Sequence, residues 1–282
     1  MTSQAARTHP ARTQLEELTR RSSAGTVPPL EGPHRFDPDV ARDYRPAAVL
    51  ALFAPTLSDS TQAADPGVDV FLVQRSRHLR HHPGQISLPG GGLEPRETPT
   101  EAAVRETHEE IGLPPEKVEV LGQLPPVLVP VSRFVVHPVL GWTHASGFER
   151  AQPGEVLHCL RVAVGDLLNP AARRAVRIAE YPHSQGSCGF QLPVGWVWGF
   201  TGNLLDHLFT HLGWDRPWDT SATYLMPMVE ALGRGVSPLP TEEEPPTQVS
   251  LPPGETPPPP AEVPQPTDEA PPASSEAPPA SS

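Results

Sequence analysis

The sequence predicts a protein of the α/β class. Five short apolar segments have the length and residue content of strands, and two longer segments have the apolar spacing of helices. Strands and helices alternate along the chain, which is typical of this class. The predicted strands are residues 47–54, 68–74, 118–121, 134–142 and 156–164, and the predicted helices are residues 99–111 and 199–212.

The first predicted helix has a defined start and a defined end. Thr98 is a good N-cap, Pro99 suits the first helical position, and Glu101 completes a Thr-x-x-Glu capping box. Gly112, followed by two prolines, ends the helix. These signals confine the helix to about residues 99–111.

Both predicted helices carry an apolar face. Val104, Thr107 and Ile111 form an arc that we expect to pack against a sheet. The hydroxyl of Thr107 then needs a partner, and the carbonyl of Ala103 one turn earlier is the expected one. The second helix has an apolar stripe that indicates core rather than a cofactor site, and it consists of Leu204, Leu205, Leu208, Phe209 and Leu212.

Three glutamates crowd another face of the first helix. Glu106, Glu109 and Glu110 stand at i, i+3 and i+4, and two carboxylates about 4 Å apart repel by about 4 kcal/mol at an effective dielectric of about 20. Glutamate-rich helices are often solvated surfaces, but Lys117, the single lysine of the chain, lies beyond this helix. Arg105 can pair with Glu109, which leaves Glu106 and Glu110 in need of a cation such as Mg²⁺ or Mn²⁺.

The helix and the glycines before it carry a motif of fixed spacing. Gly91 is followed by Glu97, then Arg105-Glu106, then Glu109-Glu110, then Gly112. This run resembles the Nudix box. The resemblance implies the Nudix fold, a mixed β-sheet sandwiched between α-helices, and hydrolysis of a phosphoanhydride by metal-activated water.

The resemblance also implies a role for each position. Glu106, Glu109 and Glu110 would bind Mg²⁺ or Mn²⁺, with a backbone carbonyl of Gly91 or its neighbour as a further ligand. Glu106 is the leading candidate for polarising the attacking water, although the base differs among Nudix enzymes. Glu97 would support the cluster, and Arg105 would hold a glutamate in position.

A second motif lies directly upstream. Arg75-Ser76 is followed by Arg80, then Gly84, then Leu88-Pro89-Gly90-Gly91. This pattern resembles the signature of the coenzyme A pyrophosphatases within the Nudix superfamily. It implies cleavage of coenzyme A or a derivative to 4′-phosphopantetheine and adenosine 3′,5′-bisphosphate, with Arg75, Arg80, Gly90 and Gly91 binding the substrate. Most arginines are ordinary surface residues, and that interpretation of Arg75 and Arg80 stays open.

The motifs leave two other functions open. A Nudix pyrophosphatase of different specificity would hydrolyse ADP-ribose, NADH, a dinucleoside polyphosphate or a damaged nucleoside triphosphate. A non-catalytic nucleotide sensor on the same fold would typically have lost box glutamates, whereas Glu97, Glu106, Glu109 and Glu110 are all present. Glu155, in a later segment similar to the same subfamily, is either a further metal or water ligand or a structural glutamate.

Composition divides the chain into three parts. These are a flexible segment of residues 1–35 with a possible short helix at 14–21, a Nudix hydrolase domain of residues 36–234, and a disordered, acidic, Pro-rich tail of residues 235–282. From Ser237 onward there is no Lys, Arg or aromatic residue, so the tail cannot bury enough apolar surface to offset the entropy of ordering. Its eight acids account for eight of the twelve net negative charges.

Several partners and locations are disfavoured by the same composition. The folded part is only mildly acidic and shows no nucleic-acid footprint. No apolar secretory core follows the start, and no run of 18 apolar residues occurs, so we expect no membrane association and a cytoplasmic location. Cys159 and Cys188 give no disulfide framework. A small-molecule substrate is the expected partner, and the oligomeric state is left open.

Overall fold

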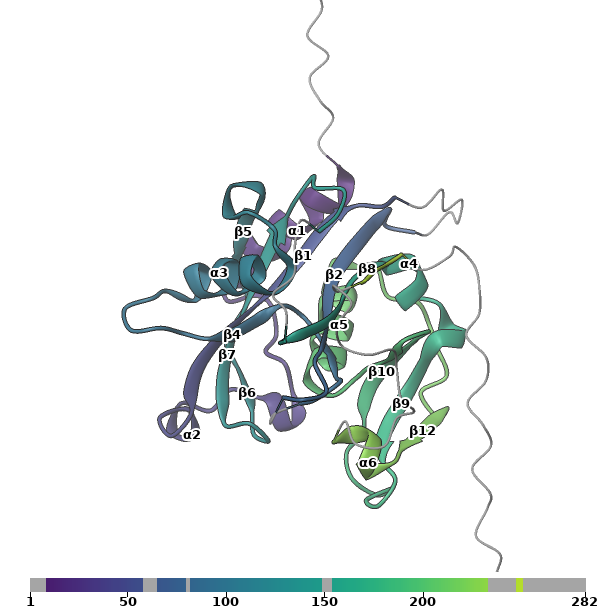
Figure 1. The fold of residues 1–282 in the computed structure, drawn as a ribbon. Coiled ribbons are helices and arrows are strands. Elements are labelled where there is room, and N and C mark those ends of the chain that lie inside the picture. Colours follow the sequence, from purple (N-terminus) through teal and green to yellow (C-terminus); the bar gives the residue numbers. More distant parts are fainter. Residues whose placement is uncertain (1–8, 58–64, 80–81, 149–153, 233–246, 251–282) are drawn as a thin grey trace, which may run out of the picture.

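The structure is a computed structural model that describes residues 9–57, 65–79, 82–148, 154–232 and 247–250, and it contains two β-sheets with helices around them (Figure 1). The larger sheet runs in the order β13 (Thr247–Ser250), β8 (Val156–Ala163), β2 (Val68–Arg75), β1 (Arg45–Pro55), β7 (Phe134–Trp142) and β5 (Glu119–Gln123). Three short strands pair beside this path, namely β3 (Ile86–Ser87), β4 (Gly90–Gly92) and β6 (Val127–Val129). The smaller sheet runs β11 (Gly195–Val197), β10 (Ser187–Leu192), β9 (Arg173–Ile178) and β12 (Thr223–Met226).

The larger sheet is mixed, and all five predicted strands are confirmed in it as β1, β2, β5, β7 and β8. Strand β1 pairs in parallel with β7 and antiparallel with β2. Successive side chains of a strand point to opposite faces, and β1 is buried along most of its length. Strand β1 therefore supplies side chains to two separate cores.

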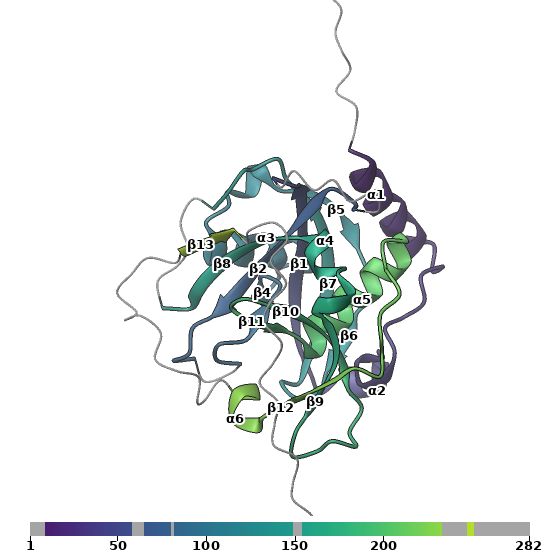
Figure 2. The same ribbon diagram turned by 90° about the vertical axis from the view of Figure 1, so that its right-hand side faces the viewer.

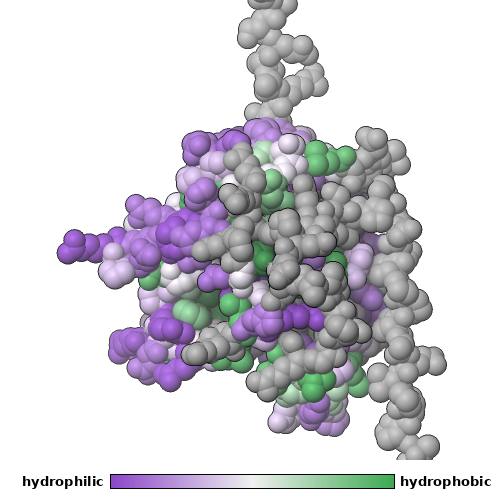
Figure 3. Space-filling model, viewed as in Figure 1, coloured by the Kyte–Doolittle hydropathy of each residue, from purple (hydrophilic) through white to green (hydrophobic). Residues whose placement is uncertain are grey.

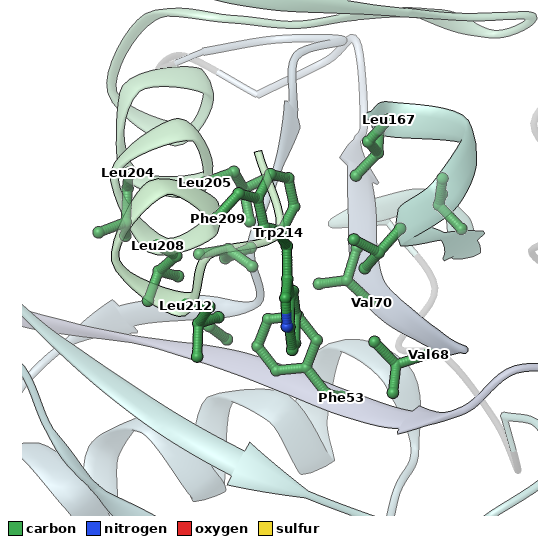
Figure 4. Packing of buried hydrophobic residues seen from close by; sticks show 14 of the residues in the cluster. Phe53, Val68, Val70, Leu167, Leu204, Leu205, Leu208, Phe209, Leu212 and Trp214 are labelled. Atoms are coloured by element: carbon green, nitrogen blue, oxygen red, sulfur yellow. The ribbon is translucent and has the colours of Figure 1, made fainter. Parts of the chain in front are cut away.

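Helices cover both faces of the larger sheet (Figure 2). On one face, Leu50 and Leu52 of β1 join a core with α3 (Pro99–Ile111). On the other face, Phe53 joins a core with α5 (Gly199–Leu212) and α1 (Pro10–Ser23), and Figure 4 shows it close to Trp214 and the apolar stripe of α5. The predicted sandwich of a mixed sheet between helices is confirmed.

The two predicted helices have the expected ends and, with one correction, the expected buried faces. The hydroxyl of Thr98 accepts a hydrogen bond from the backbone of Glu101, and Gly112 closes α3 with a left-handed φ of 70°. The hydroxyl of Thr107 donates to the carbonyl of Ala103 at 2.7 Å, as predicted. All five stripe residues of α5 are buried. The correction concerns α3, where Val104 is only half-buried and the face against the sheet is formed by Ala102, Ala103, Thr107, Glu110 and Ile111.

The N-terminal segment is not a flexible appendage over residues 10–23, which form α1. The side chains of Ala11, Leu15 and Leu18 lie in the main core, and Arg12 forms an ion pair with Glu119 of β5. These three apolar residues have helical spacing within an otherwise polar segment, so the helix is stabilised by what it covers. The folded domain therefore begins at about Pro10 rather than at residue 36.

Four residues of the predicted disordered tail also form structure. Thr247–Ser250 is β13, which pairs in parallel with β8 from Thr247 opposite His158 to Ser250 opposite Arg161. Without this strand β8 would be a sheet edge, and an edge offers unpaired backbone N–H and C=O groups to any extended chain nearby. The prediction for residues 235–246 and for residues 251–282 lies outside the described residues.

The smaller sheet was not predicted. Its strands are short, and β9 contains three arginines while β10 contains glycine, so neither has the apolar pattern of a strand. The remaining short elements are η1 (Gly32–His34), α2 (Pro38–Ala41), η2 (Pro115–Lys117), α4 (Val164–Leu167), η3 (Pro170–Ala172) and α6 (Met228–Ala231). Within the described ranges, no helix has the length and apolar content needed to cross a bilayer.

Candidate active site

The glycine strand β4 passes directly against the acidic helix α3. It pairs with β1, with Gly91 opposite Ala48 and Gly90 opposite Val49. A Cβ atom at Gly91 would collide with the carboxylate of Glu106, and one at Gly90 would collide with the backbone of β1. At Gly90 the colliding atoms are backbone, so only glycine fits there, whereas at Gly91 a side chain would displace the carboxylate of Glu106.

Glu110 is buried beneath this strand, with only 4% of its side chain exposed. Its Oε2 accepts a hydrogen bond from the backbone N–H of Gly90 at 3.0 Å, and its Oε1 lies 3.5 Å from Nη1 of Arg75. Burial raises the pKa of Glu110 to about 8, against the lowering effects of Gly90 and Arg75. The surroundings of Glu110 therefore disfavour its charged form unless a further cation approaches it.

The other two glutamates of the cluster lie in different surroundings. Glu106 has 18% of its side chain exposed, and burial is the main cause that raises its pKa. Glu109 has 43% of its side chain exposed. The surface in the region of α3 is largely hydrophilic (Figure 3). Helical spacing places all three on neighbouring positions, but only Glu106 and Glu110 point into the interior toward β4.

Arg105 binds most of the remaining carboxylates. Its guanidinium donates to Glu97 at 2.8 and 3.0 Å, to Glu106 at 2.9 Å, to Glu109 at 3.4 Å and to the carbonyl of Gly92 at 3.1 Å. The expectation that Glu106 and Glu110 have no cationic partner is therefore wrong, because Arg105 contacts Glu106 and Arg75 contacts Glu110. The planar guanidinium of Arg105 binds Glu97 and the carbonyl of Gly92 in β4 as well as Glu109, so it also contacts residues beside the sheet.

Glu155 approaches the same cluster from the start of β8. Its negative charge contributes to raising the pKa of both Glu106 and Glu110. Its carbonyl accepts a hydrogen bond from the backbone N–H of Ser76 at 2.8 Å, which ties it to the segment after Arg75. Sequence spacing alone could not place Glu155 beside the glutamates of α3, because the residues around Arg75 and Glu155 come together only through the pairing of β2 with β8.

The structure describes one of the two arginines that were predicted to bind substrate. Arg75 lies in the site through its contact with Glu110. Arg80 falls outside the described residues. A cavity of about 1030 Å³ opens elsewhere, beside Trp142, His144 and Phe148, and none of the predicted site residues lines it.

The donor chemistry of the site suits a hard divalent cation. Carboxylate and backbone carbonyl oxygens are the ligands that Mg²⁺ and Mn²⁺ prefer. Two desolvated carboxylates with raised pKa values, next to a third acid, leave the site with more negative than positive charge although Arg75 and Arg105 contact them. In the described part of the chain no three acidic, histidine or cysteine side chains are arranged to hold a metal ion, and Arg105 and Arg75 contact Glu106 and Glu110.

The chain is similar in sequence to known Nudix proteins. A family model described as NUDIX domain matches residues 45–181. A protein named "Uncharacterized Nudix hydrolase NudL" from Enterobacter sp. strain 638 is 30% identical over 177 residues, which cover 62% of this chain and 88% of that protein. A protein of the same name from Salmonella paratyphi B is 33% identical over 149 residues, which cover 52% and 77%. Among solved structures, the NUDIX domain of Shewanella oneidensis NrtR complexed with ADP ribose is 20% identical with a TM-score of 0.35, covering 47% of this chain and 81% of that chain.

The chain therefore belongs to the Nudix family, and it is a pyrophosphohydrolase of that family. Nudix hydrolases generally use divalent metal ions, which agrees with the oxygen donors of this site. The predicted family and fold are confirmed. The coenzyme A specificity, the identity of the metal ion and the roles of the individual site residues stay predictions.

Proposed function

We propose that this protein hydrolyses the diphosphate bond of coenzyme A or one of its derivatives, yielding 4′-phosphopantetheine and adenosine 3′,5′-bisphosphate. Glu106, Glu109, Glu110 and a backbone carbonyl at Gly91 would hold Mg²⁺ or Mn²⁺. The observation that carries the proposal is the meeting of buried Glu110 with Glu106 against the glycine strand, with Arg75 beside them.

Each residue has a chemical task in this proposal. The metal ion, when bound, supplies charge neutralisation at the diphosphate and hydroxide near neutral pH. Glu106 accepts the proton of the attacking water, since its carboxylate lies against Gly91 and its side chain is 18% exposed, against 4% for Glu110. The N–H of Gly90 fixes Oε2 of Glu110, and Arg105 fixes Glu97 and Glu106, so that the carboxylates are positioned before substrate arrives.

Phosphate recognition is assigned to Arg75 and Arg80. A guanidinium fork binds phosphate oxygens in a bidentate manner, and coenzyme A presents both a diphosphate and a 3′-phosphate. Arg75 supports this assignment because it lies next to the acids and keeps an unpaired donor. Its Nε is buried and has no hydrogen-bond partner among the described residues. Glu155 would contribute a further carboxylate to the metal or the water.

The chemistry is tested with Glu110→Gln. Glutamine can still accept the hydrogen bond from Gly90 but carries no charge, so turnover should fall by about 10²–10⁴-fold while the fold is kept. Glu116→Gln is the matched control, because Glu116 is exposed and lies outside the cluster. Equal turnover of the E110Q and E116Q proteins, at unchanged melting temperature, would remove the proposed role of the glutamate cluster.

Specificity is tested with a substrate panel in the presence of Mg²⁺ or Mn²⁺. The panel contains coenzyme A, dephospho-coenzyme A, ADP-ribose, NADH and a dinucleoside polyphosphate, compared by kcat/KM. The highest value for coenzyme A, lowered in dephospho-coenzyme A, supports a contact to the 3′-phosphate. A preference for ADP-ribose would overturn the coenzyme A assignment but leave the hydrolase intact. Tight binding without turnover would instead indicate a nucleotide sensor.

A further inference from the structure

The two arginines of the site differ in how completely they are bound. Arg105 donates to Glu97, Glu106, Glu109 and the carbonyl of Gly92. Arg75 makes one long contact, 3.5 Å from its Nη1 to Oε1 of Glu110, and its buried Nε has no hydrogen-bond partner in the part of the chain that the structure describes. The guanidinium of Arg105 is thus bound to several acceptors, whereas Arg75 has a hydrogen-bond donor without an acceptor.

The position of Arg75 is fixed by the backbone. The N–H of Arg75 donates to the carbonyl of Gln85 at 2.9 Å, and its own carbonyl accepts from Gly84 at 3.1 Å. The register of β2 against β8 shifts between Gln74 and Arg75. Such irregularities re-aim a side chain, and here the side chain reaches α3. The backbone N–H of the next residue, Ser76, donates to the carbonyl of Glu155, so Arg75 and Ser76 each contact a glutamate of the site.

Arg75 compensates the charge of Glu110. Within the described ranges it is the one cationic side chain paired with Glu110, and it approaches the oxygen that Gly90 leaves free. A divalent ion bound by Glu110 would compete for the same Oε1. Two cations at one carboxylate repel each other, and a buried site screens that repulsion poorly.

From this arrangement we infer that Arg75 is a positioning residue that replaces the divalent ion at Glu110 when no ion is bound. On ion binding its guanidinium leaves Glu110 and turns its free donors to a phosphate oxygen of the substrate. This inference rests on the proposed metal-dependent function. It adds that metal and Arg75 exclude each other at Glu110, and that a phosphate ligand relieves this competition because it attracts both cations.

Two consequences separate this role from an ordinary structural salt bridge. First, the loss of Arg75 destabilises the protein only when the metal is absent, because the ion otherwise takes its place. Second, the loss of Arg75 strengthens metal binding to the ligand-free protein, because a competing cation has been removed. The loss of a structural arginine such as Arg105 would destabilise the protein both with and without the metal ion.

The test compares the full-length wild type with Arg75→Gln, and with Arg77→Gln as a control that removes the same charge two residues away. Melting temperatures are measured in EDTA and in saturating Mn²⁺, and Mn²⁺ affinity is measured by calorimetric titration without substrate. For R75Q we expect a melting temperature about 5 °C below wild type in EDTA and within about 1 °C of it in Mn²⁺. We also expect about fivefold tighter Mn²⁺ binding in R75Q and little change in R77Q.

The outcomes distinguish this inference from the proposed function. If Mn²⁺ stabilises neither wild type nor R75Q, the metal-dependent function itself fails. If Mn²⁺ stabilises both proteins but R75Q keeps the same deficit in both conditions, the metal proposal stands and the role of Arg75 is overturned. Weaker Mn²⁺ binding in R75Q overturns it as well.

A second measurement keeps the inference testable if R75Q does not fold. The Nε–H resonance of Arg75 is followed by NMR in the wild type, assigned by its absence in Arg75→Lys. It should shift when Mg²⁺ is added, and shift again when adenosine 3′,5′-bisphosphate follows. An unchanged resonance after both additions would show that Arg75 remains at Glu110, contrary to the inference.

Discussion

Three consecutive glycines in β4 give a graded test of the site geometry. A Cβ at Gly91 would collide with the carboxylate of Glu106, which must then move by about 1 Å to reach ordinary contact. The far end of a glutamate side chain can make this move at small cost in stability. A catalytic group displaced by about 1 Å, however, costs about 10²-fold in rate. We therefore expect Gly91→Ala to lower kcat/KM by about 10²-fold and the free energy of unfolding by only about 1 kcal/mol.

The neighbouring glycines are the controls for this prediction. Among the described residues, a Cβ at Gly92 would meet only the carbonyl oxygen of Pro46, at 4.0 Å, so Gly92→Ala should retain both activity and stability. At Gly90 a Cβ would collide with the carbonyl of Ala48 and with Val49, both fixed in the sheet, so Gly90→Ala should lower stability by about 2–3 kcal/mol. The assays are hydrolysis kinetics and urea denaturation. Full activity in G91A, or an equal loss in G92A, would refute the close approach of β4 to Glu106.

Two further predictions concern stability. Asp69→Asn should lower the free energy of unfolding by about 3 kcal/mol in urea, because it leaves Arg161, bonded to Asp69 at 2.7 Å, as a buried unpaired charge. The double variant with Asp69→Leu and Arg161→Met should recover most of that loss, and an uncoupled pair would show no such recovery. His207 has its pKa lowered from 6.5 to about 4, chiefly by burial and then by His211. As pH falls from about 6.5 to about 4, His207 binds a proton in the unfolded state before it does so in the folded state. The free energy of unfolding should therefore fall by about 2 kcal/mol across this pH window. His207→Gln should abolish this part of the pH dependence. The free energies of wild type and His207→Gln are subtracted at each pH because the raised pKa of Glu110 changes stability in the opposite direction in both proteins. Parallel curves of unfolding free energy against pH for the two proteins would contradict the role of His207.

The sequence predicted those features that depend on residues close together in the chain. Thr98, Glu101 and Gly112 bound α3 because capping acts within one turn, and the structure reproduces both ends. The apolar stripe of α5 and the five central strands follow from periodicity in the same way. The resemblance of this loop and helix to the Nudix box also predicted the family, because the residues of the motif lie close together in the chain.

The tertiary structure alone decided which of these residues meet and how deeply each is buried. Glu106, Glu109 and Glu110 are equivalent on a helical wheel, yet the sheet buries Glu110 and leaves Glu109 exposed. The contact of Arg75 with Glu110 spans 35 positions, and Glu155 comes from the residue that directly precedes β8. Helix α1 is mostly polar and is held by the core it covers, while β13 is held by the open edge of β8. Local sequence encodes no partner for such elements, because their stability comes from surfaces formed by distant parts of the chain.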